Sequence, residues 1–495
     1  MLKTNFNFKG AGSDQWTRLI VFCVAVAHFI LVLFVVLSRI DYRYELEWME
    51  GASLIQVYRI ITGQSLYIQP SLQYIPMIYP PLYFYIGAVF AKFIGLGFLP
   101  LRIVSFASTL GCLLVIYLAV KDKTSSVLTG LVAAGSFVAT FSLGGAWFDI
   151  ARVDMLFLFL CLASVYIFGK QTIQTSIAAG FLLSLAFLTK QTAVSIFTVL
   201  AVSSLLLFRK QTLPFVCGFA LPALLTWFYL NSSTHGLYTY YILTLPATHH
   251  VKWSFLPTAI QAGFKVVAVF FIIGFSPLLF GFRKVFQDKL HLYYYLTSGG
   301  LIATSLLARI NDGSFNNTFL PAYAGAAVIF GLGVQWLADF LGQYRINKNL
   351  ILTVLWLAIG LQFVRLFYDP FQQIPTRADR TAGDALVAEL QSSPGEVLIP
   401  YHNYLALFAG KKIYFHMMTL EEVRGRFSIK QAEVKDVARQ FNSTPFSLMI
   451  TDVPDYLFQN RHCADTQNIT YGSDATFYPV TGYHIRPIFR FSDCP

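Results

Sequence analysis

The first 366 residues alternate between long apolar stretches and short polar segments. Each apolar stretch is close to the roughly 20 residues that a helix needs to cross about 30 Å of hydrocarbon. The pattern therefore predicts eleven transmembrane helices. The first is expected to be an anchor, because its apolar run is too long for a cleaved signal peptide. The expected spans are residues 17–39, 101–120, 126–143, 154–169, 173–189, 192–208, 213–230, 257–281, 290–308, 319–341 and 349–366.

One further apolar stretch, residues 79–97, either crosses the membrane or lies in its interface. The positive-inside rule separates the two interpretations, because Lys and Arg concentrate in short cytoplasmic loops. If 79–97 lies in the interface, most loop cations share the cytoplasmic side; if it crosses, every later loop is reversed. We therefore expect an external juxtamembrane helix here and a C-terminus outside. The cytoplasmic segments are then 1–18, 121–125, 170–172, 209–212, 282–289 and 342–348.

The pattern changes after residue 366, where charged helical segments alternate with short apolar strands. Such alternation is typical of a small α/β domain. The sequence thus predicts a polytopic α-helical membrane protein with a transmembrane domain over residues 1–366 and a small external α/β domain over residues 367–495. Cys463 and Cys494 both lie in the second part. Outside the membrane, in an oxidising compartment, we expect these two cysteines to form a disulfide.

The composition supports a membrane protein, because 56% of the residues are hydrophobic and only 12% are charged. A soluble domain usually carries about 25% charged residues. The net charge of +11 does not indicate nucleic acid as a partner. The cations lie in the short loops that set orientation, and neither a basic helix nor an aromatic-basic array accompanies them.

Three acids, Glu45, Glu47 and Glu50, follow the first predicted span. Glu47 and Glu50 are three residues apart, so they share a face if this segment is helical. Acidic residues contribute little to membrane orientation, so topology alone does not explain the cluster. We expect Glu50 to be functional and Glu45 to solvate the loop, whereas Glu47 fits either role.

The second external loop brings further charges to the same face of the membrane. Asp149, Arg152 and Asp154 lie within residues 144–156, and Asp154 opens a span. An aspartate at the end of a span carries a desolvation cost, which favours a function for Asp154. Asp149 is expected to solvate the loop.

Polar residues also interrupt later apolar stretches at the outer face. Lys190 lies at the outer end of a helical hairpin, where it either snorkels to the interface or binds a lipid phosphate. The loop over residues 306–323 contains Arg309, Asn316 and Asn317. These side chains either hydrogen-bond a sugar or a phosphate or form an ordinary turn. No metal-binding motif is found in the sequence.

The order of these motifs resembles that of a known superfamily. The acidic motif is followed by "RIITGQSLYIQP", by "YIPMIYPPLYFY" with Tyr79, by "PLRIVSF", by "ARVDMLF" with Asp154 and by "FLTKQ" with Lys190. This order is similar to that of the GT-C superfamily of membrane glycosyltransferases, in particular the branch of protein O-mannosyltransferases and lipid A aminoarabinose transferases. The similarity covers residues 17–210 well and 300–325 more loosely.

The resemblance implies a glycosyltransferase that uses a polyprenyl-phosphate sugar as donor at the periplasmic or lumenal face. It implies an acid of the first external loop as general base, Asp154 as the second acid and Lys190 near the donor phosphate. Many relatives carry Asp-Glu or Asp-x-Asp where this chain has Glu-Trp-Met-Glu, which leaves Glu47 and Glu50 as alternatives; we favour Glu50. Arg152 and Arg309 are further candidates for the phosphate, and Tyr79, Asn316 and Asn317 for the substrates.

The acceptor is expected to be a glycan, a lipid or a protein, with no cofactor and with membrane lipids as the surroundings. The expected location is a bacterial inner membrane with the site facing the periplasm, or an endoplasmic reticulum membrane facing the lumen. The alternative function is a transporter or flippase of lipid-linked sugars. Such proteins often have inverted repeats and polar groups at mid-membrane, whereas the acids of this chain gather at one face.

Overall fold

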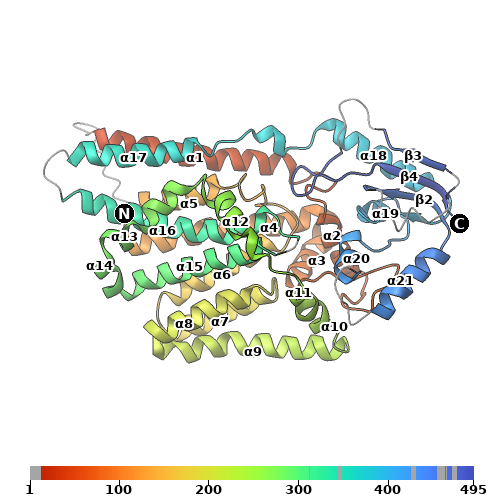
Figure 1. The fold of residues 1–495 in the computed structure, drawn as a ribbon, viewed down its shortest axis with the longest axis horizontal. Helices are drawn as coiled ribbons and strands as arrows, with labels where there is room; N and C mark the ends of the chain where they lie inside the picture. Colours follow the sequence, from red (N-terminus) through yellow and green to blue (C-terminus); the bar gives the residue numbers. More distant parts are fainter. Residues whose placement is uncertain are drawn as a thin grey trace.

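Long helices lie side by side along the long axis of the molecule, and a small sheet lies at one end (Figure 1). The computed structural model describes residues 13–311, 313–343, 348–424, 431–453, 463, 465–470 and 477–494. The long helices are α1 (Ser13–Arg39), α4 (Phe98–Thr124), α5 (Val127–Ala139), α6 (Asp154–Phe168), α7 (Ile173–Phe187), α8 (Ala193–Leu207), α9 (Arg209–Ser233), α13 (Ala268–Phe280), α15 (Lys289–Arg309), α16 (Leu320–Leu341) and α17 (Lys348–Val364).

Every predicted span overlaps at least one of these helices. Within the described part of the chain, four helical segments are long and apolar enough to cross a membrane: α1, α4, α9 and residues 316–341. A bent pair of helices would be a fifth, and the other apolar helices are shorter. The helical membrane fold is thus as expected, while the number of eleven crossings stays a prediction.

The predicted span over residues 257–281 is not one helix. It consists of α12 (Leu256–Phe264) and α13, which meet at an angle of 99°. The side chain of Gln362 on α17 reaches into the break, where its amide donates to the carbonyl of Val266 at 2.8 Å and accepts from the N–H of Val269 at 3.3 Å. Buried backbone groups need partners, and Gln362 supplies them where the helical ladder stops.

Local sequence explains how several helices begin and how closely they pack. Ser126 and Asp288 cap the N-termini of α5 and α15, and Thr172 forms a capping box with Thr175 at the start of α7, as these residue types favour. The backbones of helices α7 and α9 are in direct contact at their glycines. A Cβ on Gly180 would lie 2.2 Å from the carbonyl oxygen of Phe215, so small residues permit this approach.

Short helices fill the junction between the bundle and the sheet (Figure 1). Helix α3 (Leu82–Ile94) occupies the stretch predicted to lie in the interface and packs against α2 (Glu50–Ile61) and α4. A helix of this length spans only about 20 Å, which is less than the hydrocarbon thickness. Other short helices are α10 (Leu237–Thr239), η1 (Tyr240–Thr244), α11 (Leu245–Ala247), η2 (Trp253–Phe255), η3 (Asn316–Phe319) and η4 (Pro370–Gln373), whereas α14 (Phe282–Gln287) lies at the end of the bundle away from the sheet.

In its described residues, the C-terminal part combines a four-stranded sheet with the α-helices α18 to α21. The strand order is β1-β2-β4-β3, in which β1 pairs with β2 in parallel and the other pairs are antiparallel. Strand β4 begins only at Phe489, two residues after Pro487, which has no N–H to donate. The elements are α18 (Arg377–Ser392), β1 (Val397–Leu398), α19 (Tyr404–Phe408), α20 (Met417–Arg424), α21 (Gln431–Ser443), β2 (Phe446–Thr451), β3 (Asp465–Asn468) and β4 (Phe489–Cys494).

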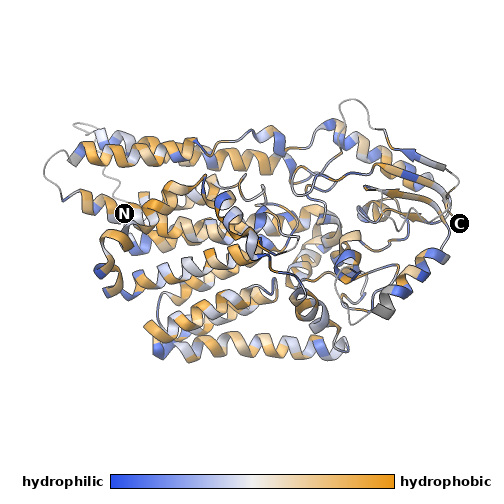
Figure 2. Ribbon diagram, in the orientation of Figure 1, coloured by the Kyte–Doolittle hydropathy of each residue, from blue (hydrophilic) through white to orange (hydrophobic). Residues whose placement is uncertain are grey.

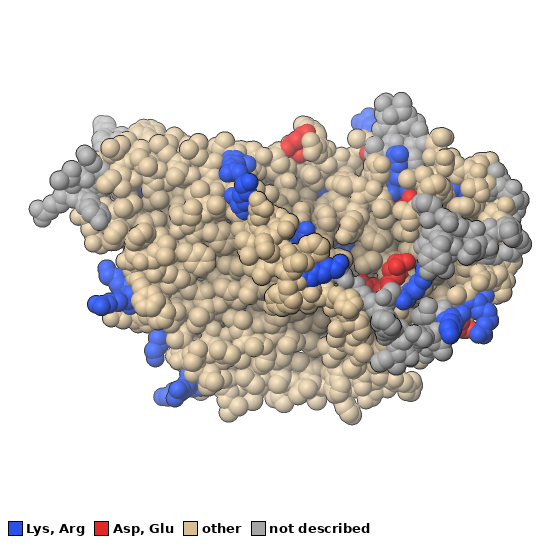
Figure 3. Space-filling model, viewed as in Figure 1, with Lys and Arg blue, Asp and Glu red and all other residues tan. Residues whose placement is uncertain are grey.

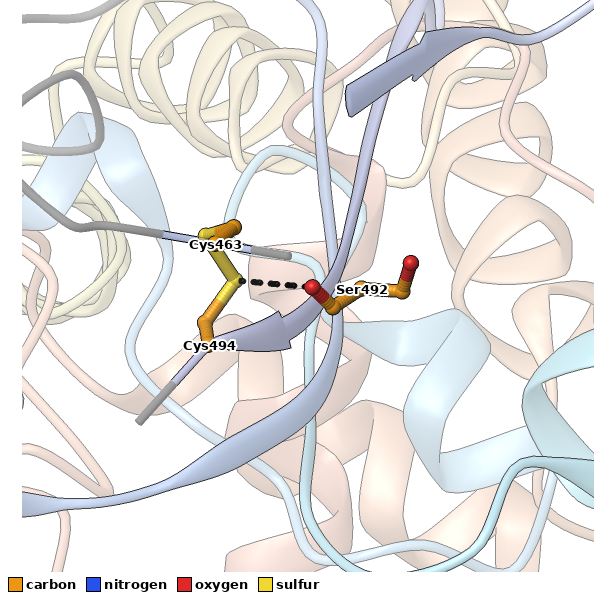
Figure 4. Close-up of a disulfide and its surroundings, with 3 residues drawn as sticks. All are labelled: Cys463, Ser492 and Cys494. Carbon is orange, nitrogen blue, oxygen red and sulfur yellow. Dashed lines mark hydrogen bonds between the residues drawn. A yellow bond between two sulfur atoms is a disulfide. The ribbon is translucent and has the colours of Figure 1, made fainter. Parts of the chain in front are cut away.

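The predicted disulfide is confirmed. Cys463 and Cys494 are joined by a bond of 2.07 Å, and Cys494 ends β4 two residues after Ser492 (Figure 4). The bond ties the segment before β3 to the last strand of the sheet.

Polarity divides the molecule along its long axis. Apolar residues dominate the long helices, whereas polar residues are more frequent at the sheet (Figure 2). On the face drawn in Figure 3, Lys and Arg lie at the left end, in one group above the middle of the helical part, and from the centre to the right end, while much of the lower surface over the helices carries no charge. This distribution suits a helical part in lipid and a sheet beside the membrane.

Candidate functional site

Glu50, the favoured base, is the first residue of α2 and is fully occupied by hydrogen bonds. Its two carboxylate oxygens accept from Arg102 at 3.1 and 2.6 Å and from the backbone N–H groups of Leu46 and Ala151 at 2.7 and 2.6 Å. Glu50 and Arg102 are both 0% exposed. A carboxylate with four donors has no free side for a substrate proton, so this geometry disfavours Glu50 as a base.

Arg102 holds the first external loop in place through several hydrogen bonds. Besides Glu50, its guanidinium donates to the carbonyl oxygens of Tyr42 and Tyr44, both at 2.6 Å. All of these groups are buried, and a buried ion pair is favourable only when its remaining hydrogen bonds are satisfied. The Glu50–Arg102 pair therefore fixes the path of the chain on both sides of Glu47.

Glu47 is buried with far fewer partners. Its carboxylate accepts from Nη1 of Arg152 at 2.7 Å, and Arg152 is the only side chain hydrogen-bonded to it among the described residues. The backbone of Met49 adds a further contact. Burial raises the pKa of Glu47 to about 7, against the opposing effect of the Arg152 charge. A carboxylate with a pKa near neutral is well suited to accept a proton at physiological pH.

Arg152 connects Glu47 with the aromatic side chains around it. Its Nη2 donates to the hydroxyl of Tyr79 at 3.2 Å, and its guanidinium lies 5.7 Å and 5.8 Å from the ring centres of Tyr79 and Trp147. The Nε atom of Arg152 is buried and has no partner among the described residues. An unpaired buried donor is costly, so a bound group that accepts from this nitrogen would be stabilised.

Asp154 opens α6 and forms the second ion pair of the site. One of its carboxylate oxygens accepts from Nζ of Lys190 at 2.6 Å, and the other accepts from the indole N–H of Trp147 at 2.9 Å. Lys190 lies in the turn between α7 and α8, with its side chain 18% exposed. Asp154, Lys190 and Asn317 line a cavity of about 20 Å³, which is enough for about one water molecule.

The structure thus brings together Glu47, Arg152, Tyr79, Asp154, Lys190 and Asn317, which were predicted from separate stretches of the sequence. Arg309 lies apart from them. Its Nη1 donates to the hydroxyl of Ser314 at 2.9 Å, and with Lys252 it lines another cavity of about 300 Å³. Asn316 begins η3 and lines neither of these two cavities. No group of three or more possible metal ligands occurs among the described residues.

The expectation that Glu45 and Asp149 solvate their loops is wrong. Asp149 is buried and paired with Arg39 at 2.5 Å, and Glu45 is buried against His402 at 2.6 Å. The other ring nitrogen of His402 contacts Asp452 at 2.7 Å. Burial opposes the charge on His402, but the two carboxylates raise its pKa to about 10. These acids therefore anchor the loops instead of facing water.

Sequence reasoning missed the buried partners Arg39, Arg102, His402 and Asp452. A signal was present for two of them, because Arg39 and Arg102 lie at the ends of apolar stretches, where a charge is expensive without a partner. His402 and Asp452 each follow a short apolar run, "VLIPY" and "SLMIT", a position at which polar residues are common, so the sequence carries no such signal for them.

Comparisons with known proteins agree with the predicted resemblance. Residues 79–232 match the family model described as dolichyl-phosphate-mannose-protein mannosyltransferase. ArnT from Cupriavidus metallidurans, solved with undecaprenyl phosphate, is 12% identical, with a TM-score of 0.58 over 94% of this chain and 97% of that chain. AglB from Archaeoglobus fulgidus, solved with an inhibitory peptide and a dolichol-phosphate, is 12% identical, with a TM-score of 0.53 over 87% of this chain and 69% of that chain. No curated protein matches the sequence.

These likenesses confirm the predicted GT-C resemblance, and with it an integral membrane fold. At 12% identity they show the fold alone. The chemistry of this chain must therefore be argued from its own site.

Proposed function

We propose that this chain, which has the GT-C fold and matches the mannosyltransferase model over residues 79–232, transfers a sugar from a polyprenyl-phosphate donor to an acceptor at the outer face of the membrane. The observation that carries the proposal is the pairing of two buried acids with two cations, Glu47 with Arg152 and Asp154 with Lys190. The undecaprenyl phosphate and dolichol-phosphate in the solved structures of ArnT and AglB support a lipid phosphate as part of the donor.

Glu47 acts as the general base in this proposal. An acceptor hydroxyl is a poor nucleophile until a base removes its proton, and Glu47 has the raised pKa and the few partners that this role needs. The acceptor oxygen attacks the anomeric carbon of the sugar, and its proton passes to Glu47. The bond from that carbon to the phosphate oxygen breaks, and the polyprenyl phosphate leaves with the electron pair.

Lys190 and Arg152 stabilise the leaving phosphate. The departing group gains negative charge, which nearby cations and N–H donors stabilise in a site without bulk water. Lys190 lines the cavity beside Asp154, and Arg152 has an unpaired buried Nε atom. Asp154 positions Lys190 and Trp147 through its two oxygens, so we assign it a positioning role and leave proton transfer to Glu47.

The proposal includes the sidedness of the molecule. Residues 1–366 would form the membrane-embedded catalytic domain and residues 367–495 an external domain over the site. In a bacterium the site would face the periplasm, and in a eukaryotic cell the lumen of the endoplasmic reticulum. Among the described residues, the paired charges lie where the external loops meet, and this does not favour the alternative of a flippase.

The test is a donor panel. Purified protein in lipid nanodiscs is incubated with polyprenyl-phosphate mannose, glucose, galactose and aminoarabinose, with a solubilised membrane extract as the source of acceptor. Release of free polyprenyl phosphate is measured. We expect release with at least one donor and its loss in the Glu47→Gln variant. In proteoliposomes, a flippase would move labelled donor across the bilayer without cleaving it, and that result would refute the proposal.

A further inference from the structure

A short segment near the C-terminus, residues 480–483, lies directly on the loop that carries Glu47. Thr481 and Glu47 form an isolated parallel bridge, in which the N–H of Thr481 donates to the carbonyl of Leu46 at 3.1 Å. The hydroxyl of Thr481 donates to the carbonyl of Gly145 in the second external loop. One buried threonine thus ties together the loop of Glu47 and the loop that leads to Arg152.

The next residue, Gly482, touches the side chain of Glu47. A Cβ added to Gly482 would lie 2.9 Å from Cγ of Glu47 and 3.2 Å from its Oε1 atom. The φ angle of Gly482 is +79°, a conformation that residues with a Cβ adopt only at a cost. The positive φ angle and the lack of room for a Cβ atom therefore both require glycine at position 482, where the chain passes Glu47.

Aromatic side chains extend this contact around the site. The ring of Tyr483 lies 6.2 Å from that of Trp48 and 5.9 Å from that of Phe315, and Phe315 lies 5.6 Å from Trp147. Trp147 in turn donates to Asp154. Tyr483 is therefore packed between Trp48, the neighbour of Glu47, and Phe315, which lies against the indole that holds the second acid.

We propose that Thr481 and Gly482 are positioning residues for the base, so that the C-terminal part of the chain completes the catalytic site of the membrane-embedded part. Thr481 fixes the distance between the two external loops. Gly482 leaves room for the Glu47 carboxylate to keep its hydrogen bond to Arg152. The inference rests on the proposed role of Glu47. It goes beyond that role by making the distant C-terminal segment a part of the site.

The experiment compares two glycines of similar backbone conformation. Gly410 also has a positive φ, +66°, but nothing lies within 4 Å of its added Cβ. Gly482→Ala and Gly410→Ala should thus carry similar backbone strain, whereas only Gly482→Ala pushes on Glu47. We expect Gly482→Ala to lower kcat for polyprenyl-phosphate release at least about tenfold, since displacement of about 1 Å can cost up to about 100-fold, and Gly410→Ala to leave kcat near that of the parent.

A pH profile separates positioning from a general loss of stability. The charged groups that face Glu47 are Arg152, just before α6, and Glu50, at the start of α2. His416, the residue before α20, lies against Trp48, the neighbour of Glu47. Displacing Glu47 from Arg152 removes the charge that favours its ionised form. The acid limb of the kcat/KM profile should then move to higher pH in Gly482→Ala only. Equal kcat values and profiles in the two variants would overturn the proposal.

A measurement independent of turnover keeps the inference separate from the proposed function. Hydrogen exchange of the backbone amides of residues 44–50, followed by mass spectrometry, should be faster in Gly482→Ala than in Gly410→Ala or the parent. If no donor is cleaved but exchange changes as expected, the positioning contact stands while the proposed reaction fails. If exchange is unchanged in Gly482→Ala, the positioning proposal fails whether or not the donor is cleaved.

Discussion

Glu47 and Glu50 come from one short motif, yet the structure connects them in opposite ways. Glu50 receives four hydrogen bonds, two from Arg102 and two from backbone N–H groups. Glu47 has one side-chain donor, Arg152, whose Nε atom has no partner among the described residues. Both acids are buried, so burial does not separate them. The two acids differ in the number of hydrogen bonds that each already makes within the protein.

The difference shows how a buried acid can serve structure or chemistry. A carboxylate whose oxygens are all occupied stabilises the charges around it but offers nothing to a substrate. A carboxylate held by one cation is kept in place and can still take up a proton. Its raised pKa is the consequence of incomplete compensation for burial. Perturbed acids of this kind gather at functional sites, and the predictions below test whether this distinction holds.

The largest effect is expected for Glu47→Gln. The amide keeps the shape of the side chain but cannot accept the acceptor proton, and loss of a general base typically costs about 10²–10⁴-fold in rate. We expect kcat to fall by this factor while donor KM stays near that of the parent. A Glu47→Gln variant that transfers sugar at the parent rate would assign the base to another residue.

Glu50→Gln should instead act on stability. It leaves the buried Arg102 charge without its counter-charge, and breaking a buried ion pair in this way costs about 3–5 kcal/mol in the free energy of unfolding. Unfolding in detergent, followed by intrinsic tryptophan fluorescence, should show the loss. If Glu50→Gln unfolds like the parent but is inactive, Glu50 is the base and the comparison of the two acids is reversed.

Lys190 and Arg309 offer a second, smaller contrast, because both were predicted to bind the donor phosphate. Lys190 lines the cavity beside Asp154, whereas Arg309 is bonded to Ser314 in another cavity. Hydrogen bonds to charged groups contribute about 1.5–3 kcal/mol, so Lys190→Ala should raise donor KM about 10–100-fold. Arg309→Ala should change donor KM within about twofold, as for substitutions away from a site. Equal effects would place the phosphate between the two cations.

Much of the fold could be predicted from the sequence, because it depends on local patterns. Apolar periodicity located the long helices, and the two C-terminal cysteines indicated their disulfide. The bend between α12 and α13 could not be predicted, since the Gln362 side chain that satisfies it comes from a distant helix.

The candidate site was predictable in its members and not in their connections. The motif order indicated Asp154 and Lys190 together with either Glu47 or Glu50, and Glu50 was favoured. The structural argument for Glu47 depends on Arg102 and on two backbone N–H groups from separate loops, which occupy the carboxylate of Glu50. The pair of Glu45 and His402 joins residues 357 positions apart. Such pairings are set by tertiary packing, which hydrophobic periodicity does not encode.

The smallest predicted effect is the dependence of rate on pH. Glu47 must be ionised to act as base, and burial raises its pKa to about 7. The kcat/KM for donor should therefore fall about tenfold between pH 8 and pH 6, whereas an ordinary glutamate, with a pKa near 4.3, would leave it flat.

The free energy of unfolding should change with pH in the opposite direction. A group with a raised folded pKa contributes stability that is complete below its ordinary pKa and is lost as the pH rises through about 7. Arg152→Gln removes the charge that opposes the shift, so its acid limb should lie at higher pH than in the parent. A parent profile that is flat from pH 5 to pH 8 would show that Glu47 does not carry the proton, and that the contrast with Glu50 is one of packing alone.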